Sequence, residues 1–525
     1  MTLPVQLYGY KVQLAWFCHL YSNDPLPWKP MANTALSAHP NTAADSTAVL
    51  MAKTSLVDQI VQWTERRVAE QAFRPGMRMP SVRELAAERG VSRFTVVEAY
   101  ERLVARGVLQ ARRGAGFFVR EPAVQREKRT IEPKRSKTID VGWLVRNMLS
   151  GIPASLSPGY GSLPSVLSGG ELIKSGLRAL NTVPAGQLCR GAHAQGYLRL
   201  REHLVRKLGE LEIAATPAQL MTTSGCTQAV TLIAEHFLKP GDVVLTGDPA
   251  WSAQLGALVM QGIQIVGVPT TEQGPDLVAM AALAAKHKPR MLLINSVLQN
   301  PTGTVLSAAA AYQILRIAEQ HDMVIVEDDV YADFVPEGIP TSRLASLDQL
   351  QRVIYISSFS KMLAPSMRVG FIAAQPHIIQ DLVLHKLLSM WATPELDERV
   401  VLSALTEGGY RKHCQRVHAK LDALREPVFR RFEKLGFKPL CKPPAGFLGW
   451  FDTGVDTNVL AAAALDAGFL FAPGALFSAQ QTPGPWLRMN ITTSDDPNML
   501  KWLAKTLEHL HGQPGVGTTR SEFPL

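Results

Sequence analysis

The sequence predicts two folded units of different kinds: a small helical domain with a β-hairpin, followed by a large α/β domain with a mostly parallel sheet. The chain has 525 residues, which is too long for one ordinary domain. Residues 53–120 show helical periodicity interrupted by Gly and Pro-Gly turn signals. From residue 141 onward, short apolar runs alternate with helical stretches, as in a parallel sheet covered by helices.

The composition excludes several classes of protein. Apolar residues make up 46% and charged residues 19% of the chain, which is typical of a globular protein and not of a disordered one. No apolar run reaches the roughly 18 residues of a membrane span, and the N-terminus lacks the pattern of a secretory signal. The five cysteines are scattered without metal-ligand spacing. We therefore expect a cytoplasmic protein with reduced thiols, no metal site and no membrane partner.

Positive charge is concentrated in one part of the chain. The net charge is +9. Residues 51–120 hold 13 Lys and Arg against 7 Asp and Glu, and residues 121–137 hold 6 against 3, so the remaining segments are neutral overall. A basic segment joined to a neutral body indicates a polyanionic partner for that segment alone, although a solvated charged face would give the same counts.

Two segments beside the small domain show no pattern of a folded core. Within the first of these, residues 1–52, four prolines and two Asn-Thr pairs lie between residues 25 and 42, a composition typical of loops. We expect a disordered extension there, or a translation start at or near Met51. Residues 121–140 combine prolines with many Lys and Arg, so we expect an extended basic linker that also contacts phosphates without sequence preference.

The small domain, residues 53–120, is predicted to contain a helix-turn-helix. Ser81 and Glu84 have the spacing of a capping box, in which each side chain satisfies a free backbone N–H at the start of a helix. Gly90 ends that helix, and Ser92 begins the next one. Two short helices joined by so tight a turn are typical of helix-turn-helix proteins.

A basic hairpin follows the helix-turn-helix. The predicted strands Val108–Arg112 and Phe117–Arg120 flank a tight Gly-Ala-Gly turn, and Arg112 and Arg113 lie at its tip. Helices followed by such a hairpin predict a winged helix.

The motifs of residues 74–119 resemble the DNA-binding domain of GntR-type regulators. The segments that carry the resemblance are RPGMRMPSVRELA at 74–86, GVSRFTV at 90–96, AYERL at 99–103 and GAGFFV at 114–119. The resemblance implies binding to a double-stranded DNA operator. Ser92, Arg93 and Thr95 would begin the recognition helix, where Arg93 could contact a guanine and the hydroxyls a phosphate. Arg83 would face the backbone, unless Arg83 and Arg93 only pair with Glu84 or Glu98.

In the large domain, polar motifs follow the predicted strands. The apolar runs are 243–245, 264–268, 291–295, 324–326 and 353–356. The sequences NPTG at 300–303, EDDVY at 327–331 and SSFSK at 357–361 follow three of these runs, and SGCTQ at 224–228 begins a helix. Ligands of such sheets bind at the carboxyl ends of the strands, so we expect the functional site there.

These motifs, in this order, resemble the fold-type I aminotransferases that use pyridoxal 5'-phosphate. The resemblance covers roughly residues 150–510 and implies a smaller α+β subdomain beside the main sheet, and a homodimer. A winged helix joined to this domain resembles the MocR subfamily of GntR-type regulators. In that case residues 141–525 would bind the cofactor and a small amino-compound effector.

The resemblance also implies a role for each residue of the site. Lys361 matches the Schiff-base lysine, and Asp328 matches the carboxylate that keeps the pyridine nitrogen protonated. Asn300 and Tyr331 would bind the ring hydroxyl, and Trp251 would stack on the ring. The phosphate would be bound by Ser224, Gly225, Cys226, Ser358, Ser360 and Arg368. Arg488 would bind the carboxylate of a substrate or effector.

One segment departs from the aminotransferase pattern. Family enzymes usually carry a Tyr before an acidic-Pro-x-Gly turn that precedes a Leu-Arg pair. In residues 189–199 that Tyr and the Pro of the turn are missing, which puts efficient transamination in doubt. Three functions therefore remain open: a regulator that senses an amino compound or the cofactor itself, a working aminotransferase with a DNA-binding arm, and a DNA-binding protein with a cofactor-free scaffold. The complete set of cofactor residues disfavours the third.

Overall fold

The computed structural model describes residues 55–120, 141–148 and 151–511. The chain divides into two compact units, residues 1–133 and 134–525. The predicted N-terminal extension, 1–52, and the predicted linker, 121–140, lie outside the described residues. In the described part of the chain, no helix is both long and apolar enough to cross a membrane.

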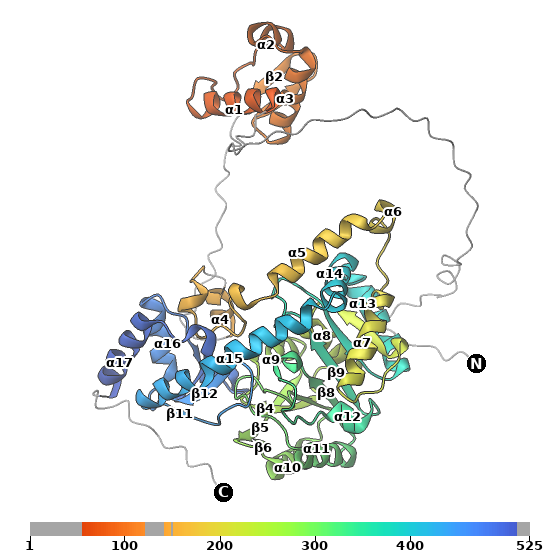
Figure 1. Ribbon diagram of the computed structural model, residues 1–525, viewed down its shortest axis with the longest axis vertical. Helices are drawn as coiled ribbons and strands as arrows, with labels where there is room; N and C mark the ends of the chain where they lie inside the picture. The colour runs from red at the N-terminus through yellow and green to blue at the C-terminus, as the bar shows by residue number, and fades with distance from the viewer. Residues whose placement is uncertain (1–54, 121–140, 149–150, 512–525) are drawn as a thin grey trace, which may run out of the picture. The chain divides into compact units, whose positions relative to one another are not determined.

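The first unit is the predicted three-helix domain with its hairpin (Figure 1). It consists of α1 (Leu56–Ala69), α2 (Val82–Arg89), α3 (Arg93–Ala105), β1 (Leu109–Arg112) and β2 (Gly116–Val119). The capping box of Ser81 and Glu84 is present, and Gly90 ends α2 with φ of 63°, a left-handed conformation that Gly adopts without strain. Buried residues of α1, α2 and α3 form one core with Leu109 and Val119 of the hairpin.

The second unit is built on an eight-stranded sheet with the order β3-β10-β9-β8-β7-β4-β5-β6. Its strands are β3 (Leu220–Thr223), β4 (Val243–Asp248), β5 (Gln264–Thr271), β6 (Gly274–Pro275), β7 (Met291–Ile294), β8 (Val324–Asp328), β9 (Val353–Ser358) and β10 (Gly370–Ala373). β10 runs antiparallel to both β3 and β9, and β6 runs antiparallel to β5. The other pairs are parallel, so the predicted mostly parallel sheet is confirmed.

The strands read as continuous apolar runs because both faces of the sheet are buried. Val353 and Tyr355 of β9 point into one core cluster, and Ile354 and Ile356 point into the other. The helices of this unit are α4 (Val141–Met148), α5 (Gly170–Ala179), α6 (Ala185–Leu188), α7 (Leu198–Glu210), α8 (Cys226–Phe237), α9 (Ser252–Met260), α10 (Leu277–His287), α11 (Ala308–Gln320), α12 (Leu344–Asp348), α13 (Pro376–Met390), α14 (Glu395–Thr406), α15 (Gly409–Lys434), α16 (Thr457–Asp466) and α17 (Pro497–His511).

A second, four-stranded antiparallel sheet forms the smaller subdomain that the sequence predicts. Its order is β11-β12-β14-β13, with β11 (Lys438–Pro439), β12 (Leu448–Asp452), β13 (Ala472–Pro473) and β14 (Trp486–Asn490). Figure 1 shows this region, with α16 and α17, beside the main sheet. Asn490, at the end of β14, donates to the carbonyls of Tyr160 and Ser162 at 2.9 Å each. This contact joins the subdomain to residues 159–162, which border Lys361.

Candidate functional site

The predicted motifs of the large unit meet at one edge of the main sheet. β8 ends at Asp328 and β9 ends at Ser358, so both carboxyl ends lie at this edge. β3 ends at Thr223, and α8 begins three residues later at Cys226. β10 is antiparallel, so its first residue, Gly370, pairs with Thr223 and Ser358. Residues from three distant parts of the chain are thereby brought together.

Lys361 lies between the main sheet and the segment 159–162. Its Nζ donates to the carbonyl of Gly161 at 2.5 Å and to Oγ of Ser162 at 3.3 Å. Removal from water and the positive charge of Arg488 lower the pKa of Lys361 to about 8, although the negative charge of Asp328 opposes the shift. A lysine amine with this pKa is neutral more often than usual near physiological pH, which suits attack on a carbonyl carbon.

Asp328 is buried, with 3% of its surface exposed. Oδ2 accepts from Nε2 of Gln254 at 2.5 Å, and Oδ1 accepts from the backbone N–H of Val330 at 3.1 Å. Burial raises the pKa of Asp328, whereas the hydrogen bonds from Gln254, Cys226 and Val330 lower it. A buried carboxylate with these donors can stabilise a positive charge placed beside it.

Six residues form a cradle around the N-terminus of α8: Ser224, Gly225, Cys226, Ser358, Ser360 and Arg368. Oγ of Ser360 accepts from Nη1 of Arg368 at 3.0 Å, and the carbonyl of Ser224 accepts from Nη2 at 2.8 Å. Oγ of Ser358 donates to Oγ of Ser360 at 3.0 Å. Gly225 has φ of 88°, and a Cβ there would lie 2.7 Å from Nη2 of Arg368. A glycine at this position therefore lets the backbone and the guanidinium approach each other closely.

The cradle has the properties of a phosphate site. The first N–H groups of a helix have no intrahelical acceptor, and the helix dipole favours an anion beside them. Arg368 adds a positive charge and Ser360 adds a hydroxyl. The thiol of Cys226 bonds to Asp328. Cys226 can therefore offer the cradle only its backbone N–H. This donor set fits a phosphorylated cofactor whose reactive part reaches Lys361.

Arg488 is fully buried and is the largest such side chain in the described residues. Its Nη1 donates to Oδ1 of Asn300 at 3.0 Å, and Nη2 donates to the carbonyl of Gly159 at 2.6 Å. Its Nε has no hydrogen-bond partner among the described residues. A buried guanidinium with an unused donor is costly unless a ligand completes it, so Arg488 suits a carboxylate.

Aromatic side chains enclose this guanidinium. Its carbon lies 5.3 Å from the ring centre of Trp251 and 4.6 Å from that of Phe477. Tyr331 is buried, and burial raises its pKa, whereas the charge of Arg488 and a hydrogen bond with Asn300 lower it. The structure thus brings all of the predicted cofactor residues and Arg488 to one site.

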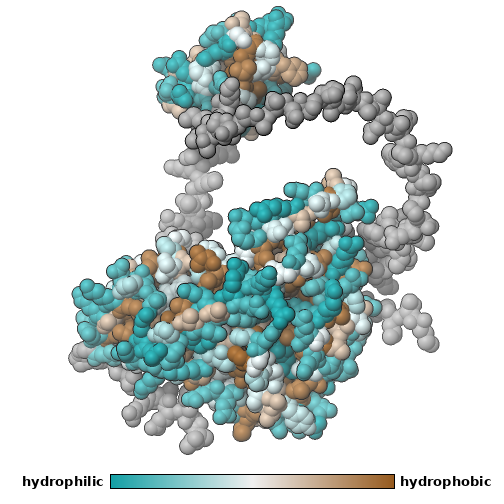
Figure 2. All heavy atoms as spheres, in the orientation of Figure 1, coloured by the Kyte–Doolittle hydropathy of each residue, from teal (hydrophilic) through white to brown (hydrophobic). Residues whose placement is uncertain are grey.

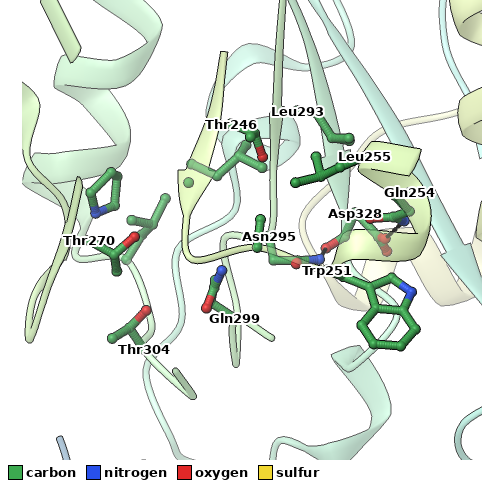
Figure 3. Close-up of a pocket in the computed structure, with 15 residues that line it drawn as sticks. Thr246, Trp251, Gln254, Leu255, Thr270, Leu293, Asn295, Gln299, Thr304 and Asp328 are labelled. Atoms are coloured by element: carbon green, nitrogen blue, oxygen red, sulfur yellow. Dashed lines mark hydrogen bonds between the residues drawn. The ribbon is translucent and has the colours of Figure 1, made fainter. Parts of the chain in front are cut away.

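A cavity adjoins this site at the ends of β4, β7 and β8. Figure 3 shows Trp251 and Gln254 on the side where Asp328 lies, and Thr270 and Thr304 on the opposite side, with Asn295 between the two groups. The lining combines apolar residues such as Leu255 and Leu293 with the hydroxyls of Thr246, Thr270 and Thr304.

Three parts of the site were not predicted from the sequence: Gln254, the segment 159–162, and Asn490. Gln254 lies three residues after Trp251, so both fall on one side of the helical turn that begins α9, and this spacing could have identified it. Gly159 and Gly161, two glycines separated by one residue, were a weaker signal of close backbone approach. A Cβ on Gly161 would lie 3.1 Å from Arg488.

The segment that departs from the enzyme pattern is ordered around Gly196 and Tyr197. Gly196 has φ of 103°, and a Cβ there would clash with Thr222 of β3. The N–H of Tyr197 donates to Oε2 of Glu398 at 2.9 Å, and the Arg399 guanidinium lies 4.4 Å from the Tyr197 ring centre. Tyr197 therefore packs against α14.

In the small unit, the predicted DNA-contacting residues lie at the starts of α2 and α3 and on the hairpin. Ser92 caps α3, and its Oγ lies 2.8 Å from Oγ1 of Thr95, so the two hydroxyls bond to each other. Arg83 and Arg93 are exposed. Arg113 is exposed at the hairpin turn, whereas the Arg112 guanidinium lies over the ring of Phe118 at 4.4 Å.

The alternative partners of these arginines are occupied elsewhere. Glu84 accepts from the N–H of Ser81 at 2.8 Å, and Glu98 pairs with Arg102 at 2.6 Å. Among the described residues, neither Arg83 nor Arg93 takes part in an ion pair. Both guanidinium groups are therefore available to phosphates or bases, and their contacts with DNA stay a prediction.

Comparisons with known proteins agree with this geometry. Residues 170–507 match the family described as aminotransferase class I and II, and residues 56–119 match the bacterial regulatory proteins of the gntR family. The chain is 26% identical to YdfD of Bacillus subtilis, an uncharacterized HTH-type transcriptional regulator, over 82% of this chain and 91% of that protein. It is 28% identical to the HTH-type transcriptional regulator TauR of Rhodobacter capsulatus, over 81% and 90%.

Solved structures resemble the large unit. The α-aminoadipate aminotransferase LysN of Thermus thermophilus, complexed with a phosphopyridoxyl-leucine, has a TM-score of 0.63 and 27% identity, covering 70% of this chain and 95% of that one. The kynurenine aminotransferase of Pyrococcus horikoshii has a TM-score of 0.64 and 25% identity, covering 70% and 94%.

Proposed function

Because the chain belongs to the class I and II aminotransferase family and carries a GntR-family DNA-binding domain, the combination of the MocR subfamily, we propose that it is a transcription regulator whose DNA binding responds to a small amino compound. Its cofactor is pyridoxal 5'-phosphate. The observation that carries the proposal is the meeting of Lys361, Asp328 and Arg488 in a unit joined to a winged helix.

Each residue of the site has one task in this proposal. When bound, the cofactor supplies an aldehyde that reacts reversibly with amines. Lys361 provides the protein's own amine, and its lowered pKa keeps a fraction of it neutral. Asp328 holds negative charge where the pyridine nitrogen would carry a proton, and the cradle of Arg368 and Ser360 binds the phosphate. Asn300 and Tyr331 position the ring hydroxyl.

The effector is proposed to be an amino compound that also carries a carboxylate. Its amine would compete with Lys361, and its carboxylate would bind Arg488, whose Nε lacks a partner among the described residues. Such a ligand changes DNA affinity only if it binds two arrangements of the protein with different free energies. The proposal therefore includes a change in the arrangement of the protein when the effector binds.

Assembly and location complete the proposal. We infer a homodimer formed through residues 141–525 and a cytoplasmic location. Two winged helices in one dimer would contact two half-sites of an operator.

An absorbance scan with added amines tests this function. The purified protein is expected to show the near-visible band of a cofactor bound to lysine, and one class of amine should change the band. In gel shifts, the same amines should change the affinity for DNA upstream of the protein's own gene. Steady turnover with an amino donor and an oxo acid, together with DNA affinity that no amine changes, would instead identify a working aminotransferase.

A further inference from the structure

Phe94 is the most exposed large hydrophobic residue of the small unit within its described range, residues 55–120. It has 82% of its surface exposed and lies in the first turn of α3, directly after Arg93. Figure 2 shows hydrophobic residues on the surface of this unit among hydrophilic ones. The other large hydrophobic side chains exposed in the described part of the unit are Leu56 and Met77, at 55% and 44%.

The position of Phe94 on α3 excludes a role in the core. Val96, Ala99, Tyr100 and Leu103 are the buried residues of α3. At about 100° per residue, Phe94 lies about 180° around the helix from Leu103. The ring therefore projects from the centre of the face that the core does not use, where it gains nothing from burial within this unit.

The surroundings of Phe94 indicate a nucleic acid as its partner. Residues 55–120 hold 12 Arg and Lys against 7 Asp and Glu. Arg83 and Arg93 are exposed and take part in no ion pair among the described residues. The hydroxyls of Ser92 and Thr95 bond to each other in the cap, which leaves Arg93 and Phe94 as the side chains that extend from the first turn of α3.

We propose that Phe94 contacts the 5-methyl group of a thymine in the major groove, next to the base contacted by Arg93, and so selects T at one position of each half-site. The proposal rests on the DNA-binding function given above. Thymine is the one base that presents a methyl group in the major groove, and apolar side chains, Phe included, recognise it there. An aromatic ring beside a free guanidinium can thus select a T next to a G.

The test removes the methyl group without changing base pairing. The full-length, cofactor-loaded protein first selects its binding sequence from a random duplex library. The thymine next to the selected guanine is then replaced by deoxyuridine in both half-sites. We expect the affinity of the unchanged protein to fall about fourfold per methyl group. Phe94→Ala should bind both duplexes equally, and Phe94→Leu should keep part of the preference for thymine.

Leu56→Ala is the matched control, because it removes an exposed apolar side chain from α1 of the same unit. This variant should keep both the affinity and the preference for thymine. Equal binding of the thymine and deoxyuridine duplexes by the unchanged protein would overturn the proposal, as would a Phe94→Ala variant that still prefers thymine. Failure to select any sequence would instead contradict the regulatory function itself.

Discussion

Lys361 and Arg488 are two positive groups in one site, and the charge of Arg488 affects the protonation of Lys361. Burial and the charge of Arg488 hold the pKa of Lys361 at about 8. At pH 7 about one Lys361 amine in ten is then neutral, against fewer than one in a thousand for an ordinary lysine. Because the neutral amine is the nucleophile, the lowered pKa favours attachment of the cofactor at physiological pH.

The rate of cofactor attachment should therefore rise about tenfold from pH 7 to pH 9 and level off above a midpoint near 8. Arg488→Gln should move this midpoint upward, since it removes a charge that disfavours the protonated amine. Stopped-flow absorbance of the apo-protein mixed with pyridoxal phosphate measures both profiles, and their ratio cancels the titration of the cofactor. Identical profiles would show that Arg488 does not act on Lys361.

Gln254 is expected to position Asp328. Gln254→Leu removes the donor to Oδ2 of a buried carboxylate, so the pKa of Asp328 should rise further and its pairing with the cofactor should weaken. Loss of a hydrogen bond to a charged buried group costs about 1.5–3 kcal/mol, which corresponds to roughly 10- to 100-fold in cofactor affinity.

Equilibrium dialysis measures the cofactor affinity, and Gln264→Leu, at the exposed start of β5, serves as the control. The pH at which the near-visible band titrates should also change in Gln254→Leu but not in the control. A Gln254→Leu variant with unchanged affinity and an unchanged titration would remove Gln254 from the site.

At the scale of elements, the start of α8 depends on a glycine. Gly225→Ala would force a non-glycine residue into φ of 88° and place its Cβ 2.7 Å from Arg368. We expect cofactor affinity to fall at least about tenfold, because the new Cβ would displace Arg368 from the cradle and a hydrogen bond to a charged group contributes about 1.5–3 kcal/mol. Calorimetric titration with pyridoxal phosphate measures this loss.

Gly256→Ala provides the comparison, because it lies inside α9 with no atom within 4 Å of the new Cβ. It should leave cofactor affinity unchanged and stabilise the fold by about 0.5–1 kcal/mol, as Ala does in a helix interior. Equal losses of affinity in both variants would mean that the phosphate does not lie at α8.

The elements were more predictable than the contacts between them. Strands β4, β5, β7, β8 and β9 follow the predicted apolar runs, since burial on both faces leaves a clear pattern in the sequence. The resemblance located Lys361 and Asp328, which carry the chemistry. The partners of Lys361 at residues 161 and 162 were not predictable, because they lie 200 and 199 residues away and act through a carbonyl and a hydroxyl without a distinctive motif.

At the scale of the whole molecule, a dimer with two winged helices should require an operator with two half-sites. If Arg83, Arg112 and Arg113 contact phosphates in both copies, affinity should fall about a thousandfold between 50 and 200 mM salt. Fluorescence anisotropy with one or two half-sites measures both effects. A monomer in light scattering at micromolar concentration, or equal affinity for one and two half-sites, would contradict the paired arrangement.

The coupling between binding of the amino compound and binding of the operator must also be reciprocal. If an amino compound changes operator affinity by a given factor, the operator must change the affinity for that compound by the same factor. Titration of the amine with and without the operator checks this equality. A mismatch would show that the compound acts on the DNA or on aggregation, and not through the site at Lys361.

The antiparallel strand β10 determines when a nascent chain can first hold its cofactor. Among the strands that the structure describes, β3 pairs with β10 alone. Ser224 and Gly225 are therefore synthesised long before the strand that fixes them beside Arg368. Until residue 373 has left the ribosome, β3 has no strand to pair with, and the two halves of the phosphate cradle are not held together. An unpaired strand edge is also a site of aggregation. Binding of pyridoxal phosphate during translation would therefore report completion of the sheet, and fragments that end before β10 should not bind it.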